Sequence, residues 1–318
     1  MIKKIFRKLG LGKLAYILYY LPQEFSKKIF KRGIINSVID DQNRIEMEKA
    51  TYKILSIASV PDVSNNVYDV YFLTGEKFWY QTCFCMYSLI QASGENLRPV
   101  IYDDGTLQEG QVNEIKRIFF NVKIVSTAEI QKKLDECLPS SKFPYLRERR
   151  IDYLNIRKLI DPHIASSGWK MVLDSDMLFF RNPIMLVDWL KDPRCPCHMV
   201  DVENSYGYSI QLMEHLAKAK VAQRVNVGVC GLKSEDIDWE KLEYWCKKLI
   251  EKAGMHYYME QALTAMLIAG KECTVLPPEE YVVMPGERES MKPKAAMYHY
   301  VAQSKPWYFR HGWRNIIS

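Results

Sequence analysis

The chain has 318 residues, of which 48% are hydrophobic and 26% are charged, a composition that fits a folded protein and excludes a disordered or fibrous chain. The net charge is +6, but residues 1–34 hold nine Lys or Arg and one Glu, so this segment carries about +8 and the remainder about −2. A general nucleic-acid binder would spread its positive charge over the folded domain, so this distribution argues against that class.

The first 34 residues predict one or two amphipathic basic helices, because apolar residues recur at helical spacing with lysine and arginine between them. Such a segment suits an anionic membrane surface, although a helix packed on the domain with a solvated basic face has the same pattern. No apolar run approaches the ~20 residues that span a bilayer, and no signal peptide is evident. We therefore expect a cytoplasmic protein, peripheral at the inner face of the membrane.

Residues 35–65 are expected to form a connector with a short helix. The sequence thus predicts two parts: a basic amphipathic helical extension at residues 1–65, and one catalytic domain at residues 66–318 that includes an aromatic C-terminal tail. That tail either closes over a ligand as a lid or anchors the C-terminus to the core.

Apolar strands alternate with helices from residue 67 onward. The pattern predicts strands at 67–75, 97–105, 121–126 and 169–177, with helices from Trp79 to Gln91 and from Ile151 to Ile164. This order is typical of an α/β fold with a mixed, mostly parallel sheet flanked by helices. Ligands bind beyond the carboxyl ends of such strands, where Thr74, Asp103 and Asp104 fall.

The strongest chemical signal is an apolar strand that ends in two carboxylates, Asp174 and Asp176, separated by one residue. Two such charges repel each other unless a cation neutralises them. Mg²⁺ and Mn²⁺ take oxygen ligands and bridge to phosphates, so the pair suits a diphosphate ligand. A solvated turn would explain an isolated pair equally well, but the strand before it and the apolar segment after it favour a metal site.

The segment from Val172 to Pro183 resembles the DxD segment of GT-A-fold glycosyltransferases, particularly glycosyltransferase family 8 and its relatives. Further motifs of that family follow in the expected order, and together they cover about residues 67–307: Asn226-Val-Gly228, Glu260-Gln261, His299-Tyr300 and Lys305-Pro306-Trp307. The resemblance implies a GT-A fold, which is a Rossmann-like mixed sheet that binds a nucleotide-sugar.

The resemblance also implies a metal site. Asp174, Asp176 and His299 would hold Mn²⁺ or Mg²⁺, and Lys305 would bind the phosphates of the donor together with Asp174. Taken singly, a histidine near the C-terminus is more often a surface residue or a satisfied core residue than a ligand, and Lys305-Pro306-Trp307 could be only a packed turn. The order of the motifs together with the Asp pair favours the functional interpretation of His299 and Lys305.

The resemblance implies a donor site as well. Thr74, Asp103 and Asp104 would hold the base and ribose, although Asp-Asp-Gly is a good turn on its own. Arg157 and Lys158 would lie near the diphosphate, although a solvated helix face explains them nearly as well.

Three residues are expected near the reacting sugar carbon. Asn226 belongs to the strand beside the sugar, and Glu260 and Gln261 would supply a base or a polar group that steadies an oxocarbenium-like state. The family more often has Asp where Glu260 stands, and the longer side chain could serve as the base of an inverting enzyme. Retention is nevertheless favoured over inversion.

The sequence therefore predicts a metal-dependent hexosyltransferase that moves a sugar from a nucleotide-sugar, expected to be a UDP-hexose, to a glycan or lipid-linked acceptor in surface polysaccharide synthesis. One alternative is a non-catalytic sugar-nucleotide-binding protein. The other is a haloacid-dehalogenase-like phosphatase with Asp174 as nucleophile, which is disfavoured because the motif lies mid-chain and Met177 follows it.

Overall fold

The computed structural model describes residues 34–55 and 66–317. The chain divides into two compact units, with the boundary between Lys49 and Ala50. Helix α4 (Ile34–Thr51) begins in the first unit and ends two residues past this boundary. It has 18 residues and is therefore longer than the short helix that the sequence predicts. The amphipathic segment predicted at residues 1–34 lies, apart from its last residue, outside the described residues. No helix of the described part is both long and apolar enough to cross a membrane.

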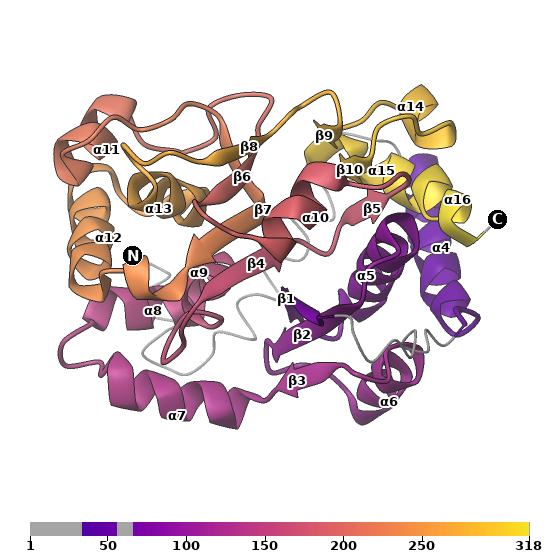
Figure 1. The fold of residues 1–318 in the computed structure, drawn as a ribbon, viewed down its shortest axis with the longest axis horizontal. Coiled ribbons are helices and arrows are strands. Elements are labelled where there is room, and N and C mark those ends of the chain that lie inside the picture. The colour runs from indigo at the N-terminus through magenta and orange to yellow at the C-terminus, as the bar shows by residue number, and fades with distance from the viewer. Residues whose placement is uncertain (1–33, 56–65, 318) are drawn as a thin grey trace. The chain divides into compact units, whose positions relative to one another are not determined.

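A seven-stranded mixed sheet forms the centre of the second unit, in the order β3-β2-β1-β4-β7-β6-β8 (Figure 1). Its strands are β1 (Tyr68–Thr74), β2 (Leu97–Asp103), β3 (Lys123–Val125), β4 (Trp169–Leu173), β6 (Cys197–Val200), β7 (Val225–Lys233) and β8 (Thr274–Leu276). Strands β3, β2, β1 and β4 run parallel, β7 is antiparallel to both its neighbours, and β6 and β8 are parallel. The predicted mixed, mostly parallel sheet is confirmed.

A smaller three-stranded sheet carries the C-terminal motifs. It has the order β5-β10-β9, with strands β5 (Met177–Phe179), β9 (Tyr281–Val283) and β10 (Met297–His299). The antiparallel register of β10 with β5 places His299 opposite Met177, directly after the Asp-x-Asp segment. Residues more than 120 positions apart in the chain are thereby brought together.

Helices cover both faces of the large sheet. The longer ones are α5 (Trp79–Ser93), α6 (Glu109–Ile118), α7 (Thr127–Cys137), α8 (Pro144–Asp152), α10 (Ile184–Lys191), α11 (Ile210–Ala217), α12 (Trp239–Ala253) and α13 (Met259–Leu267). The shorter ones are α9 (Arg157–Ile160), α14 (Glu287–Met291), α15 (Lys305–Trp307) and α16 (Arg314–Ile317). In Figure 1, α8, α12 and α13 lie on one side of the sheet, while α5 lies on the other side beside β5.

The sequence prediction of one continuous helix from Ile151 to Ile164 is wrong. Helix α8 ends at Asp152, and a 3-10 turn (Leu154–Ile156) and the four-residue α9 follow. The break is at Tyr153, whose backbone leaves the helical region with φ −136° and ψ 88° and whose ring is buried. Burial of this tyrosine is a tertiary effect that the apolar spacing does not encode.

Candidate active site

Strand register brings the two carboxylates, a glycine and a histidine together. The Asp174 amide donates to the Gly228 carbonyl on β7 (2.8 Å), and the Tyr300 amide donates to the Asp176 carbonyl (2.9 Å). A Cβ at Gly228 would lie 2.3 Å from Cε1 of His299, so only glycine leaves space for the imidazole. The backbone therefore fixes the position of His299 against the Asp-x-Asp segment.

Each of the two carboxylates divides its oxygens between a lysine and the imidazole. Asp174 accepts from Lys158 Nζ (2.6 Å) through Oδ1, and its Oδ2 lies 3.7 Å from His299 Nε2. Asp176 accepts from Lys305 Nζ (2.5 Å) through Oδ2, and its Oδ1 lies 3.1 Å from the same Nε2. Burial would raise the pKa of Asp176, but Lys305 and His299 outweigh burial and hold it below its ordinary value.

These contacts leave two carboxylate oxygens and one imidazole nitrogen facing one point. Among the described residues, Asp174, Asp176 and His299 form the one group of at least three His, Cys, Asp or Glu side chains whose ligand atoms lie within 4.8 Å of one another. Hard divalent cations bind such oxygen-rich sets, and Mn²⁺ also accepts imidazole. The donor set fits the predicted metal.

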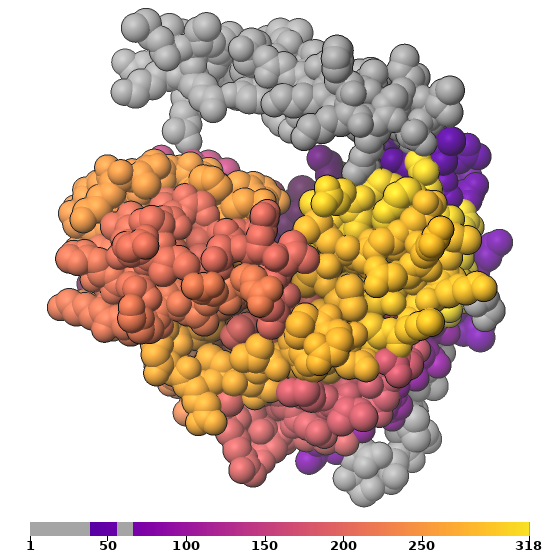
Figure 2. Space-filling model, turned by 90° about the horizontal axis from the view of Figure 1, so that it is seen from above, coloured from indigo at the N-terminus to yellow at the C-terminus, as the bar shows by residue number. Residues whose placement is uncertain are grey.

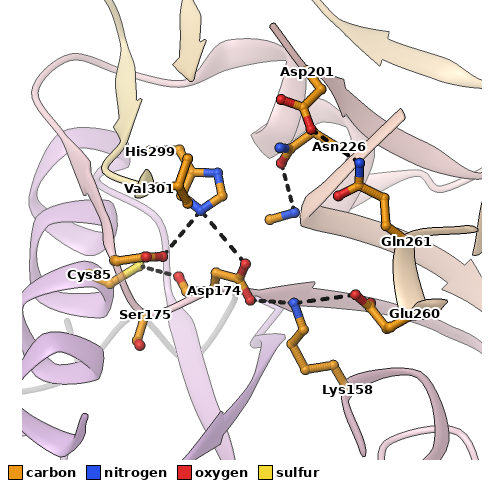
Figure 3. A network of polar contacts seen from close by, with 12 residues as sticks. Cys85, Lys158, Asp174, Ser175, Asp201, Asn226, Glu260, Gln261, His299 and Val301 are labelled. Atoms are coloured by element: carbon orange, nitrogen blue, oxygen red, sulfur yellow. Dashed lines mark hydrogen bonds and ion pairs between the residues drawn. The ribbon is translucent and has the colours of Figure 1, made fainter. Parts of the chain in front are cut away.

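Lys158 joins the Asp-x-Asp segment to helix α13. Its Nζ lies 3.8 Å from Glu260 Oε2 as well as against Asp174 (Figure 3). Burial raises the pKa of Glu260 to about 7, and the negative Asp174 adds to this effect, although Lys158 opposes it. Conversely, the two carboxylates raise the pKa of Lys158 despite its burial, so it stays protonated.

Gln261 points toward Asp201, a residue that the sequence interpretation missed. Its amide Nε2 donates to Asp201 Oδ2 (3.1 Å), and both side chains are buried (Figure 3). Nearby, Asn226 Oδ1 accepts from the Gly228 amide (2.9 Å). Asp201 directly follows the buried strand β6, so the rule that polar residues at strand ends form sites would have found it.

The residues predicted to bind the nucleoside lie at the carboxyl ends of β1 and β2. These two ends are side by side, because Thr74 pairs with Asp103. Thr74 is buried and accepts from the Thr82 hydroxyl (2.9 Å), and Asp104 holds its own turn through the Thr106 amide and hydroxyl. Asp103 is directed to backbone amides of its turn, Gly105 and Leu107.

One cavity of about 610 Å³ connects these groups. All of the predicted site residues line it except Asp103 and Arg157. Arg157 instead donates to the carbonyls of Arg150 and Asp104, which fixes the start of α9. Figure 2 shows the surface hollowed between the orange and the yellow parts of the chain, which carry α13 and the C-terminal motifs.

The aromatic C-terminal tail is largely packed into the domain. Tyr308 and Trp313 are buried, and Trp313 meets Phe84 edge to face with ring centroids 5.6 Å apart. Lys305 and Ala302, at the start of the tail, line the cavity. These contacts agree with one of the two alternatives from the sequence, in which the tail anchors the C-terminus to the core. The other alternative, closure of the tail over a ligand, stays a prediction.

No protein-family model matches this sequence, and no curated protein matches it. Solved structures do. The galactosyltransferase LgtC, solved with donor and acceptor sugar analogs, superposes with a TM-score of 0.53 at 16% identity, over 78% of this chain and 94% of LgtC. The bifunctional glycosyltransferase WbbM gives a TM-score of 0.51 at 12% identity, over 82% of this chain and 50% of WbbM.

At these identities the likeness concerns the arrangement of the backbone. The mixed sheet, the position of the Asp-x-Asp segment after β4 and the coverage of nearly all of LgtC agree with what the sequence motifs imply. The chain has the GT-A fold of the nucleotide-sugar glycosyltransferases.

Proposed function

We propose that this protein is a metal-dependent glycosyltransferase that moves a hexose from a nucleotide-sugar, a UDP-hexose, to a glycan or lipid-linked acceptor in surface polysaccharide synthesis. The observation that carries the proposal is the convergence of Asp174, Asp176 and His299 at a cavity of about 610 Å³ in a GT-A fold. Ligand sites for small molecules and cofactors occupy ~300–1,000 Å³, so the cavity has the right size for a donor.

Asp174, Asp176 and His299 would hold Mn²⁺ or Mg²⁺ through the atoms that face one another. When bound, the ion supplies a Lewis acid that neutralises negative charge on the leaving diphosphate. Lys305 would turn from Asp176 toward a donor phosphate, because its amine is half-buried at the cavity wall and carries no other partner among the described residues. Thr74 and Asp104 would contact the nucleoside at the far end.

Lys158, Glu260 and Gln261 would surround the transferred sugar. Lys158 orients Glu260 toward the metal ligands, and Asp201 orients the Gln261 amide. Gln261 and Asn226 would offer uncharged polar groups to a sugar carbon that gains positive character, as it does in retaining and in inverting transfer alike. With a pKa of about 7, Glu260 is also matched to a general base, the role it would have in an inverting enzyme.

The decisive test measures donor hydrolysis without acceptor, using a panel of UDP-, GDP- and CMP-sugars with Mn²⁺. Wild type should release sugar from one UDP-hexose, and Asp176→Ala should release at least about 100-fold less. Asp192→Ala is the matched control, because this carboxylate is 63% exposed and pairs with Arg194 away from the cavity. Donor binding without release would favour the non-catalytic sugar-nucleotide binder, and neither binding nor release would refute the proposal.

The stereochemistry of transfer and the contact with a membrane are tested separately. Proton NMR of the first product reports the anomeric configuration, and an inverted product that disappears in Glu260→Gln would assign the base role to Glu260. Sedimentation with anionic vesicles, comparing the full chain with a chain lacking residues 1–34, tests the proposed contact with the cytoplasmic membrane face.

A further inference from the structure

A pair of exposed tyrosines lines the cavity on the side of α13. Tyr257 is 66% exposed and Tyr258 is 38% exposed, and both immediately precede the helix turn that carries Glu260 and Gln261. Their rings meet edge to face at 5.2 Å between centroids, and Tyr258 stacks on His256 at 5.5 Å with an interplanar angle of 27°. We call Tyr257 and Tyr258 the tyrosine rim.

Buried tyrosines hold the backbone that presents the tyrosine rim. The Tyr153 hydroxyl donates to the Tyr257 carbonyl, and the Tyr208 hydroxyl donates to the Gly254 carbonyl (3.0 Å) and accepts from the His256 amide (3.2 Å). The two rings are therefore exposed on an anchored segment. Large aromatic surfaces held in place beside a cavity are typical of binding sites, because little conformational entropy is lost when a ligand packs on them.

Acidic residues outnumber basic residues in the lining of the cavity. Among the described lining residues, Lys158 and Lys305 are the only lysines or arginines, and both are paired with the carboxylates of the metal site. The remaining acidic lining residues include Asp201, bonded to Gln261 in the first turn of α13, and the exposed Glu203 two positions later. A phosphate placed against the tyrosine rim would thus find, among the described residues that line the cavity, acidic groups and no lysine or arginine beyond the two paired ones.

We propose that the tyrosine rim binds the acceptor, and that the part of the acceptor bound there is an uncharged saccharide. The apolar C–H face of a sugar ring packs on the tyrosine faces, while its hydroxyls donate to the carboxylates of the neighbouring loop. The acceptor hydroxyl that reacts then lies next to Glu260 and Gln261, since these follow the rim directly in α13. This assignment rests on the proposed transferase function and names the acceptor class of the same site.

The test compares neutral sugars with their charged counterparts. Methyl glycosides of common hexoses and N-acetylhexosamines, and the corresponding sugar 1-phosphates, are offered with the active donor, and transfer is measured relative to donor hydrolysis. We expect transfer to at least one neutral glycoside and at least about tenfold less to its phosphate. In Tyr257→Ala/Tyr258→Ala the ratio of transfer to hydrolysis should fall about tenfold or more, with a raised acceptor KM.

Tyr244→Ala is the matched control, because Tyr244 is 49% exposed on α12 and does not line the cavity. Saturation-transfer NMR with the same glycosides, without donor, gives a second readout that does not depend on turnover. The inference is overturned if sugar 1-phosphates are preferred, if the rim variant keeps the wild-type ratio, or if no neutral glycoside is bound or used. Absence of both donor binding and donor release would instead refute the proposed function, while the NMR comparison still decides whether the rim binds saccharides.

Discussion

Asp174 and Asp176 each bond one carboxylate oxygen to a lysine and turn the other toward the same nitrogen of His299. The charges of the two neighbouring aspartates are thus compensated by one lysine each, Lys158 beside Asp174 and Lys305 beside Asp176. The oxygens left over are the ones that a divalent cation would take, so the arrangement is already organised for it.

Mn²⁺ should raise the melting temperature of the wild-type protein, because an ion that binds only the folded state stabilises it by mass action. Asp176→Asn and His299→Ala should each remove most of this increase, because each loses a ligand of the site. Asp192→Asn, a substitution at an exposed carboxylate, should keep it. Differential scanning fluorimetry over a Mn²⁺ titration measures the effect, and an equal shift in all four proteins would contradict the assigned ligands.

Gly228→Ala should abolish the Mn²⁺ response with little loss of secondary structure. The added methyl group would lie 2.3 Å from Cε1 of His299, so the imidazole must leave its place between the aspartates. Gly110→Ala is the control, because no atom lies within 4 Å of the position that its added methyl group would take in helix α6. That change should stabilise the protein by less than the about 0.5–1 kcal/mol of a helix interior, because Gly110 lies in the first turn of α6. A wild-type Mn²⁺ affinity in Gly228→Ala would show that His299 is not a ligand.

Glu260 should make the protein less stable as pH rises. Burial raises its pKa from 4.5 to about 7 in the folded state, so between these values the folded protein binds more protons than the unfolded chain, and the free energy of unfolding falls with pH. The loss from this group is at most about 3 kcal/mol. Urea unfolding at pH 5 and pH 8 should show the loss in wild type and a smaller one in Glu260→Gln; equal losses would exclude Glu260 as the source.

Lys158→Ala should destabilise the protein by about 3 kcal/mol or more at pH 7.5, because it leaves Asp174 and Glu260 without their shared cation in a buried setting. Lys271→Ala removes a lysine from a pair with Asp236 in which both side chains are at least 40% exposed, and should cost less than about 1 kcal/mol. Chemical denaturation at low salt gives both values. Similar costs for the two variants would mean that Lys158 is solvated rather than locked between the carboxylates.

The contiguous parts of the site could be predicted from the sequence, since Asp174 and Asp176 follow an apolar strand and the later motifs keep a recognisable order. The directions of individual side chains could not. Asp103 turns to the amides of its own loop, because local hydrogen bonds compete with the cavity for its carboxylate. Arg157 turns to the backbone carbonyls of Arg150 and Asp104, and Asp104 lies 53 residues away in the chain. The break lies at Tyr153, whose buried side chain bonds to Tyr257, more than a hundred residues away, and no local pattern contains that contact.

The tyrosine rim, Glu260 and Gln261 lie within five consecutive residues, at the start of helix α13 and directly before it. On the proposed assignment, one short segment determines both which acceptor binds and which groups face the reacting sugar carbon. Hydrogen bonds from Tyr153 and Tyr208 hold the backbone of this segment in place. Exchange of this segment between homologous chains would then be an economical route to new glycosidic linkages, because the sheet, the carboxylate pair and the nucleotide end stay untouched. New products would then arise by replacement of this five-residue segment, without changes to the rest of the fold.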